Sequence, residues 1–384
     1  MIWCPSGTLP LVRKLFTMLK RIVSQEEAHQ LTEVLRELEA TTSVNSILMY
    51  VGADVNLDVA TLQEQLRQMK TTVIGAVFPE VIIDGQRFSD KSIILGLREE
   101  MASVTILDFD EVAIEDKITT AFDVPEIENA SIFIFIDALV RGKSQLLDTL
   151  YNLYGSLPNY LGGGAGSLAF RPFPCIISNA GVTHGSAVVA LMPKPITLGI
   201  AHGWKPISEP MKVTEAEGNQ VISLNWQPAM STYQKIVEEH AGKAFDFGDF
   251  FNATKSYPFG IQKLNDEMIV RDPFQTENER IFLLDDIEEG SFVQILYGDL
   301  ESLIAGAGQA RQAATDSGNL GGGTLIIDCI SRVLFMGDHF ERELLALDPE
   351  ANAFGALTLG EIANNGDSYL DVYNKTAVVG LLEQ

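Results

Sequence analysis

Charged and polar residues that could do chemistry gather in the last quarter of the chain. Arg332 follows an apolar strand-like segment ending at Asp328-Cys329. Glu343 lies on a predicted helix, and Glu361 opens a later strand-like segment. A guanidinium held by two carboxylates at the lip of a cleft can bind a small carboxylate, because it offers a planar pair of donors. The alternative is a buried Arg332–Glu343 pair with a structural role.

Cys329 is the residue of this group that could act as a nucleophile. An enzyme using Arg332, Glu361 and Cys329 is therefore one hypothesis. It is disfavoured because Cys329 lies in an apolar run, where cysteines usually pack inertly. The chain also lacks a Gly-x-Ser-x-Gly motif and a His-Glu-x-x-His zinc motif. We therefore predict a protein that is not an enzyme.

Two histidines lie beside glycines that would admit a flat, bulky ligand. His184 precedes the apolar run 187–191, and His202 lies in the stretch Gly199-Ile-Ala-His-Gly-Trp204. A neutral imidazole in an apolar slot can hold haem iron. We rank His184 ahead of His202, because a residue at the mouth of a strand can project into a slot. The alternative for each is an ordinary structural histidine.

Four glycines in five positions, Gly162, Gly163, Gly164 and Gly166, form the most glycine-rich stretch of the chain. Such residues suit a sharp turn or a close approach to the backbone. We expect a tight connection between two strands of a sheet, with the wall of a ligand pocket as the alternative. A phosphate cradle is disfavoured, because no Gly-Lys-Ser or Gly-Lys-Thr follows.

Composition limits the classes of partner and compartment. The 384 residues carry a net charge of −25, which argues against nucleic acid and anionic membrane surfaces as partners. No apolar run approaches the length of a membrane span. Cys4, Cys175 and Cys329 lie far apart, which is typical of a reducing compartment. The N-terminus lacks the features of a secretory signal, so we predict a cytoplasmic protein.

Strand and helix patterns alternate without strict strand–helix–strand regularity. They predict an α/β (α+β) fold of two domains, each with a mixed sheet flanked by helices. A proline-rich stretch suggests the seam. The predicted parts are a leader and helix (1–39), an N-terminal domain (40–195), a connecting segment (196–227) and a C-terminal domain (228–384). The chain ends soon after its last predicted strand, so we expect no output domain.

Several short motifs, in their order along the chain, resemble those of a FIST-domain protein with N-terminal and C-terminal FIST modules in tandem. Singly each motif is weak, but together they cover roughly residues 40–382. The matching stretches are the glycine stretch, Gly185 to Leu191, Gly203-Trp204-x-Pro206, Pro228-Ala229-x-x-x-Tyr233, Asp328-Cys329-x-x-Arg332, Gly360-Glu361-Ile362 and Asn374-x-Thr376.

The resemblance implies a ligand-binding input protein of bacterial signalling. Similar stand-alone two-module proteins bind haem, sense nitric oxide and act in trans on a histidine kinase. Haem with nitric oxide is thus the first expected ligand, and a small amino or carboxylic acid is the second. By the same resemblance, the glycine stretch and five further residues would surround the ligand: Trp204, Cys329, Arg332, Glu361 and Asn374.

Overall fold

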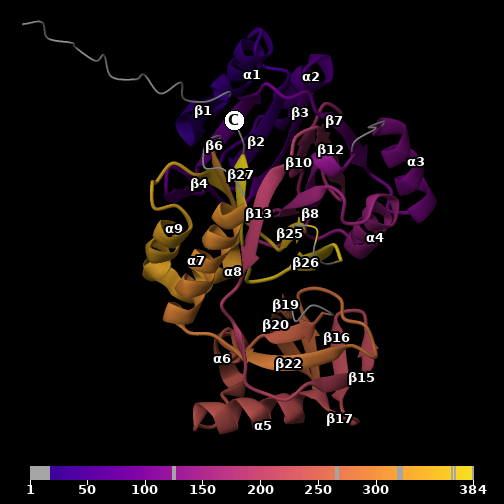
Figure 1. Cartoon of the computed structure of the whole chain (residues 1–384), viewed down its shortest axis with the longest axis vertical. Coiled ribbons are helices and arrows are strands. Elements are labelled where there is room, and N and C mark those ends of the chain that lie inside the picture. The colour runs from indigo at the N-terminus through magenta and orange to yellow at the C-terminus, as the bar shows by residue number, and fades with distance from the viewer. Residues whose placement is uncertain are drawn as a thin grey trace, which may run out of the picture.

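The computed structural model describes residues 18–382, apart from 123–126, 264–267, 318–322, 365 and 367–368. Residues 1–17 of the predicted leader lie outside the described residues. Several mixed sheets with flanking helices make up the larger part of the molecule, and a smaller sheet with its own helices lies at one end (Figure 1). The predicted α/β fold with mixed sheets in two parts is confirmed.

The larger part consists of three repeats of one order of elements: an edge strand, a helix, a strand, one or two helices, a second strand, a hairpin and a final strand. The first repeat contains β1 (Leu19–Ser24), α1 (Leu31–Glu39), β2 (Ser46–Gly52), α2 (Val59–Gln68), β3 (Thr72–Phe78), β4 (Glu80–Ile83), β5 (Gln86–Phe88) and β6 (Lys91–Leu97). The second contains β7 (Ala102–Ile106), α3 (Glu111–Ala121), β8 (Ser131–Asp137), α4 (Lys143–Tyr154), β9 (Asn159–Ala165), β10 (Ile176–Ser178), β11 (Gly181–Thr183) and β12 (Ala187–Met192). The third contains β13 (Ile196–Ala201), α7 (Leu300–Ser317), β23 (Thr324–Cys329), α8 (Ile330–Met336), α9 (Phe340–Leu347), β24 (Phe354–Thr358), β25 (Glu361–Asn364), β26 (Asp371–Tyr373) and β27 (Ala377–Leu382).

Each repeat adds its hairpin to the sheet of another repeat. The sheets run β1-β6-β2-β3-β10-β11, β7-β12-β8-β9-β25-β26 and β13-β27-β23-β24-β4-β5. In each, the two central strands of the repeat are parallel, namely β2 with β3, β8 with β9, and β23 with β24. Because every repeat both gives and receives a hairpin, the three close into a cycle, which we call the ring.

A glycine lies at the same register position of each parallel pair. Gly75 pairs with Met49, Gly162 with Ile134, and Gly355 with a residue of β23. A Cβ on Gly162 would lie 1.9 Å from the carbonyl oxygen of Ile134, so only glycine fits. The tight turn predicted at Gly162 to Gly166 is therefore wrong for its first residues, which form the central strand β9.

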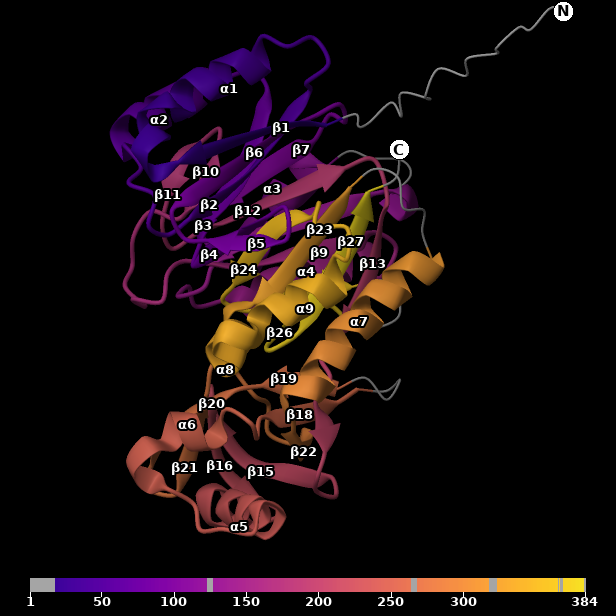
Figure 2. The same cartoon turned by 90° about the vertical axis from the view of Figure 1, so that its left-hand side faces the viewer.

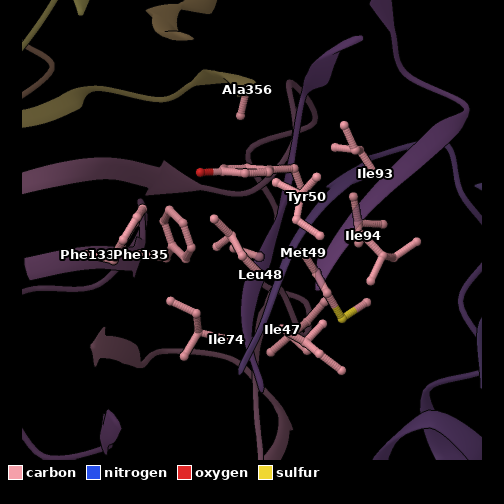
Figure 3. Close-up of a cluster of buried hydrophobic side chains, with 14 of the residues drawn as sticks. Ile47, Leu48, Met49, Tyr50, Ile74, Ile93, Ile94, Phe133, Phe135 and Ala356 are labelled. Carbon is pink, nitrogen blue, oxygen red and sulfur yellow. The ribbon is translucent and has the colours of Figure 1, made fainter. Parts of the chain in front are cut away.

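Aromatic side chains from two repeats meet in the core of the ring (Figure 3). The rings of Tyr50 and Phe78, from the first repeat, each contact Phe135 of the second edge-on, at centroid distances of 5.6 Å. Ala356 of the third repeat belongs to the same cluster and lies across from the Tyr50 ring. Burial of this apolar surface joins the three repeats into one core.

The smaller part, residues 205–298, is inserted in the third repeat between β13 and α7 (Figure 2), and we call it the module. Its nine-stranded sheet packs against α5 around a separate apolar cluster. Gly218-Asn219, a pair typical of hairpin turns, joins β15 to β16. The elements of the module are β14 (Lys205–Pro206), β15 (Met211–Glu217), β16 (Gln220–Leu224), β17 (Gln227–Pro228), α5 (Ala229–Ala241), α6 (Phe250–Thr254), β18 (Phe259–Gln262), β19 (Met268–Arg271), β20 (Pro273–Glu277), β21 (Arg280–Leu283) and β22 (Phe292–Tyr297).

Residues 196–227, expected from their prolines to connect two domains, belong to sheets. They supply β13, which lies on the open edge of the third repeat's sheet, and β14 to β16 of the module. The third repeat thus begins at Ile196 and resumes at Leu300, after the module. Within the described residues, no helix combines the length and the apolar character needed to cross a bilayer.

Candidate functional site

An open pocket of about 430 Å³ lies where the ring meets the module. Its walls come from the end of β13, from α7, from β19 of the module and from the segment around β26 and β27. A pocket of this volume suits a small organic molecule. It is lined by Ile200, Ala201, His202, Gly203, Trp204, Lys205, Met268, Ser302, Ala305, Gln309, Tyr373 and Thr376.

Glycines let the helix α7 approach this edge of the ring closely. A Cβ on Gly199 would lie 2.0 Å from the carbonyl oxygen of Ala310, and one on Gly203 would lie 2.2 Å from that of Ser302. Gly203 also has a φ of +82°, which glycine adopts without strain. Backbone thus meets backbone here, and this contact places Ser302 and Gln309 on the pocket wall.

The imidazole of His202 is held in its neutral form. Burial, followed by the nearby positive charge of Arg332, lowers the pKa of His202 to about 4. Nδ1 accepts a hydrogen bond from the backbone N–H of Trp204 at 2.9 Å. The remaining ring nitrogen faces the backbone carbonyl of Met268. Both nitrogens of His202 are therefore already engaged by the protein.

His184, the first-ranked haem ligand, lies exposed in a bend after β11 and does not project into a slot. The reason is that β11 and β10 form a short hairpin on the edge of their sheet, and His184 follows that hairpin directly. Within the described residues no group of three or more His, Cys, Asp and Glu could hold a metal ion. The roles of His184 and His202 as iron ligands stay predictions. Haem binding itself stays a prediction.

Arg332 is fully buried on α8, and all five of its donors bind protein acceptors. Nε and Nη2 donate to the two carboxylate oxygens of Glu343 at 2.6 and 2.9 Å. The other N–H groups donate to the carbonyls of His202, Lys375 and Leu303 at 2.7 to 3.0 Å. The structure thus supports the buried structural pair and leaves Arg332 without a donor for a ligand.

Glu361 and Cys329 lie buried beside Arg332 and do not themselves line the pocket. Glu361 accepts hydrogen bonds from the hydroxyl of Thr358 at 2.8 Å and the backbone N–H of Thr376 at 3.2 Å. Burial nevertheless raises the pKa of Glu361 to about 8. Burial also raises the pKa of the Cys329 thiol, the opposite of what an attacking thiolate requires.

Asp328 completes this buried group. Its Oδ1 lies 3.5 Å from Nε of Arg332, while Oδ2 has no hydrogen-bond partner among the described residues. Burial, followed by the neighbouring Glu343 carboxylate, raises the pKa of Asp328 well above its usual value. The sequence analysis was correct in grouping five residues: Asp328, Cys329, Arg332, Glu343 and Glu361. In the structure they form a packed network within the ring and not the lip of a cleft.

The predicted residue Asn374 lies at the junction with the module. Its Nδ2 donates to Asp285 of the module at 2.8 Å, and its Oδ1 accepts from the backbone N–H of Asp272 at 3.4 Å. The neighbouring Lys375 is buried and pairs with Asp272 across the junction at 3.0 Å. Neither carboxylate oxygen of Asp272 has hydrogen-bond geometry to any described residue. The ion pair with Lys375 is therefore the main interaction that offsets the cost of burying this carboxylate.

Of the predicted ligand residues, only His202 and Trp204 line the junction pocket. Gly162, Gly163 and Gly164 are buried in β9, where Gly163 and Gly164 lie against the backbone of the segment before β25. Gly166 lines a small, separate recess with Asp137 and Arg171. Sequence reasoning missed the pocket residues Lys205, Met268, Ser302, Gln309 and Tyr373, and no motif in the sequence marks them.

Lys205 carries the only formal charge on the pocket wall within the described part of the chain. The remaining polar groups there are hydroxyls, the amide of Gln309, the neutral imidazole of His202 and the backbone. A lining without carboxylates is notable in a chain with 52 acidic residues. It favours a ligand with an acidic group over a cationic one.

Comparison with known proteins identifies two family models along the chain. The FIST N domain matches residues 46–227, and the FIST C domain matches residues 229–364. The boundary between the two matches falls inside the module, at the start of α5. The uncharacterized protein MJ1623 of Methanocaldococcus jannaschii is 25% identical over 250 residues, which cover 60% of this chain and 46% of that protein. The chain thus aligns with less than half the length of that relative.

Proposed function

We propose that this chain, which belongs to the family of proteins with FIST N and FIST C domains, is a sensor that binds a small organic acid in the junction pocket. FIST domains are sensory domains of signal transduction that bind small ligands. The observation that carries the proposal is the pocket lining, with the ammonium of Lys205 and no carboxylate. Amino acids and short carboxylic acids are the ligands of choice.

The chemistry of the wall suits such a molecule. The carboxylate would meet Lys205, and Gln309 and Ser302 offer further polar contacts to a second group of the ligand. Met268 and Ile200 would cover its apolar part. Haem with nitric oxide as ligand, a histidine kinase as partner in trans and the cytoplasm as location remain predictions, which the pocket geometry neither requires nor specifically favours.

The test is titration calorimetry of the full chain with a panel of mono- and dicarboxylic acids, amino acids and matched amines. We expect at least one acid to bind and the amines to fail. Lys205→Met should weaken the binding of that acid about tenfold, because a charge-assisted hydrogen bond is lost.

Lys212→Met is the matched control, since Lys212 is also an exposed lysine of the module but does not line the pocket. It should bind the same acid with unchanged affinity. The proposal is wrong if no acid in the panel binds, or if Lys205→Met binds as tightly as the wild type.

A further inference from the structure

The module is attached to the ring at two places. The first is the pair of chain crossings before and after it, which run side by side because Lys205 of β14 pairs with Tyr297 of β22. Each crossing contains a glycine: Gly203, with φ at +82°, and Gly298, where a Cβ would lie 2.4 Å from the Trp204 ring. The chain thus passes between the ring and the module in two adjacent crossings, and the second attachment rests on non-covalent contacts alone.

The second attachment is the segment 371–376, which contains β26 and which we call the strap. It passes directly over β19 of the module in both views (Figures 1 and 2). Asp371 binds Arg271 and Lys263 of the module, with both distances at 2.9 Å. Arg271 also donates to the carbonyl of Val372 at 2.6 Å. The contacts of Asn374 and Lys375 with the module, described above, complete the attachment.

The same strap is tied to the buried network of the ring. The carbonyl of Lys375 accepts from Arg332 Nη1 at 2.9 Å and from the Trp204 indole at 3.2 Å. The backbone N–H of Thr376 donates to Glu361. Lys375 itself has a φ of +51°, a left-handed conformation that costs energy in a non-glycine residue. The ring therefore fixes the strap in one backbone conformation.

The strap also forms one wall of the junction pocket, through Tyr373 and Thr376. We infer that the strap relays the binding of a ligand in the pocket to the module. Filling the pocket changes the contacts by which the module is held to the ring. The ion pairs of Asp371 are the contacts that this change loosens or tightens. The inference rests on the proposed function, because it takes the junction pocket as the site where the ligand binds.

The burial of these contacts favours the Asp371 pairs with the module as the ones that yield. The strap's links to the ring are buried, as is its Lys375–Asp272 pair with the module, whereas the carboxylate of Asp371 is 23% exposed and Lys263 is 25% exposed. Breaking a partly exposed ion pair costs less than breaking a buried one, because the separated charges regain contact with water. A shift of Tyr373 or Thr376 is thus relayed most readily to the Asp371 pairs.

The experiment replaces the unknown ligand with a side chain. Ala305→Trp, on the pocket face of α7, fills the pocket, and Ala313→Trp, at an exposed position on the same helix outside the pocket, is its control. Hydrogen–deuterium exchange of the full chain is compared in residues 255–285 and in the strap. We expect Ala305→Trp to change exchange there at least threefold, and Ala313→Trp to leave it unchanged.

The second arm removes the strap's ion pairs. Asp371→Asn should speed exchange in residues 255–285 about threefold to fivefold and abolish the further effect of Ala305→Trp. Glu99→Gln is its matched control, because Glu99 pairs with Lys194 within the ring and is also 23% exposed. If Ala305→Trp unfolds the chain, Gln309→Trp takes its place on the same wall.

The inference is overturned if filling the pocket changes exchange only at the pocket lining, or if Asp371→Asn and Glu99→Gln affect the module equally. No acid is used in these measurements. If no acid of the panel binds, the proposed acid sensor is refuted but the exchange result stands. If hydrogen–deuterium exchange in the module stays unchanged, only the proposed relay through the strap is refuted.

Discussion

Replacement of Glu361 by glutamine should change how the stability of the protein depends on pH. Burial raises the pKa of Glu361 from 4.5 to about 8 in the folded chain. The folded state therefore keeps a proton on Glu361 between these values, while the unfolded state has lost it. The stability linked to this proton is fully present below about pH 4.5 and is lost as the pH rises through about 8.

The size of the effect follows from the shift. One pH unit corresponds to about 1.4 kcal/mol, so the contribution of Glu361 should fall by on the order of 3–5 kcal/mol between pH 5 and pH 8.5. Glu361→Gln removes this dependence, because the amide does not titrate. The amide oxygen can still accept from Thr358 or from the Thr376 N–H, so the neutral network is largely preserved.

The assay is urea unfolding, followed by circular dichroism at pH 5.5, 6.5, 7.5 and 8.5. The difference in unfolding free energy between Glu361→Gln and wild type should move in favour of the variant as the pH rises. Glu99→Gln, which removes a partly exposed carboxylate from the ring, controls for the loss of one negative charge. An equal difference at pH 5.5 and pH 8.5 would refute the reasoning.

Two further substitutions test the buried contacts. Arg332→Met should lower the unfolding free energy by about 3–5 kcal/mol in urea titrations, because it leaves Glu343 buried and unpaired. The double variant with Arg332→Met and Glu343→Leu should recover part of that loss. If Arg332→Met alone is as stable as wild type, the buried pair is contradicted. Gly162→Ala should prevent folding into the native ring, since its Cβ would overlap the carbonyl of Ile134; a soluble variant with a native circular dichroism spectrum and melting temperature would show that β8 and β9 can separate.

The elements of the ring were largely predictable, because their signals are local. The apolar run at Ile132 to Ile136 forms β8 of the ring, and in the module the Gly218-Asn219 turn likewise joins β15 and β16. Both depend on residues that are neighbours in sequence. The pairing of Arg332 with Glu343 was within reach for the same reason, since only eleven positions separate them.

The threefold order of the ring was not predictable from these signals. The repeats share the order of their strands and a matching glycine each, at Gly75, Gly162 and Gly355, while their strands and connections differ in length. Hairpin exchange also pairs residues far apart in the chain, as when Ile82 meets Gly355. No local pattern specifies such a pairing, because it depends on the twist and packing of whole sheets.

The pocket escaped prediction for a related reason. Its wall combines the end of β13, α7, Met268 and the strap, four segments that converge only in the folded chain. Lys205 and Gln309 have no motif around them, and in sequence they resemble ordinary surface residues. Glu361 and Arg332 attracted attention because charges in apolar surroundings are conspicuous, yet burial gives them a structural role.

The buried charges are also unevenly placed among the repeats. Strand pairing sets Glu361 opposite Gly163, and the matching positions of the other hairpins hold Val81 and Ile176. An apolar residue at this position is evidently compatible with the ring, and a buried carboxylate is costlier. The repeat that accepts this cost is the one that carries the module, and its Glu361 fixes the backbone of the strap. We therefore interpret the network as the means by which the ring holds the strap in position against the module.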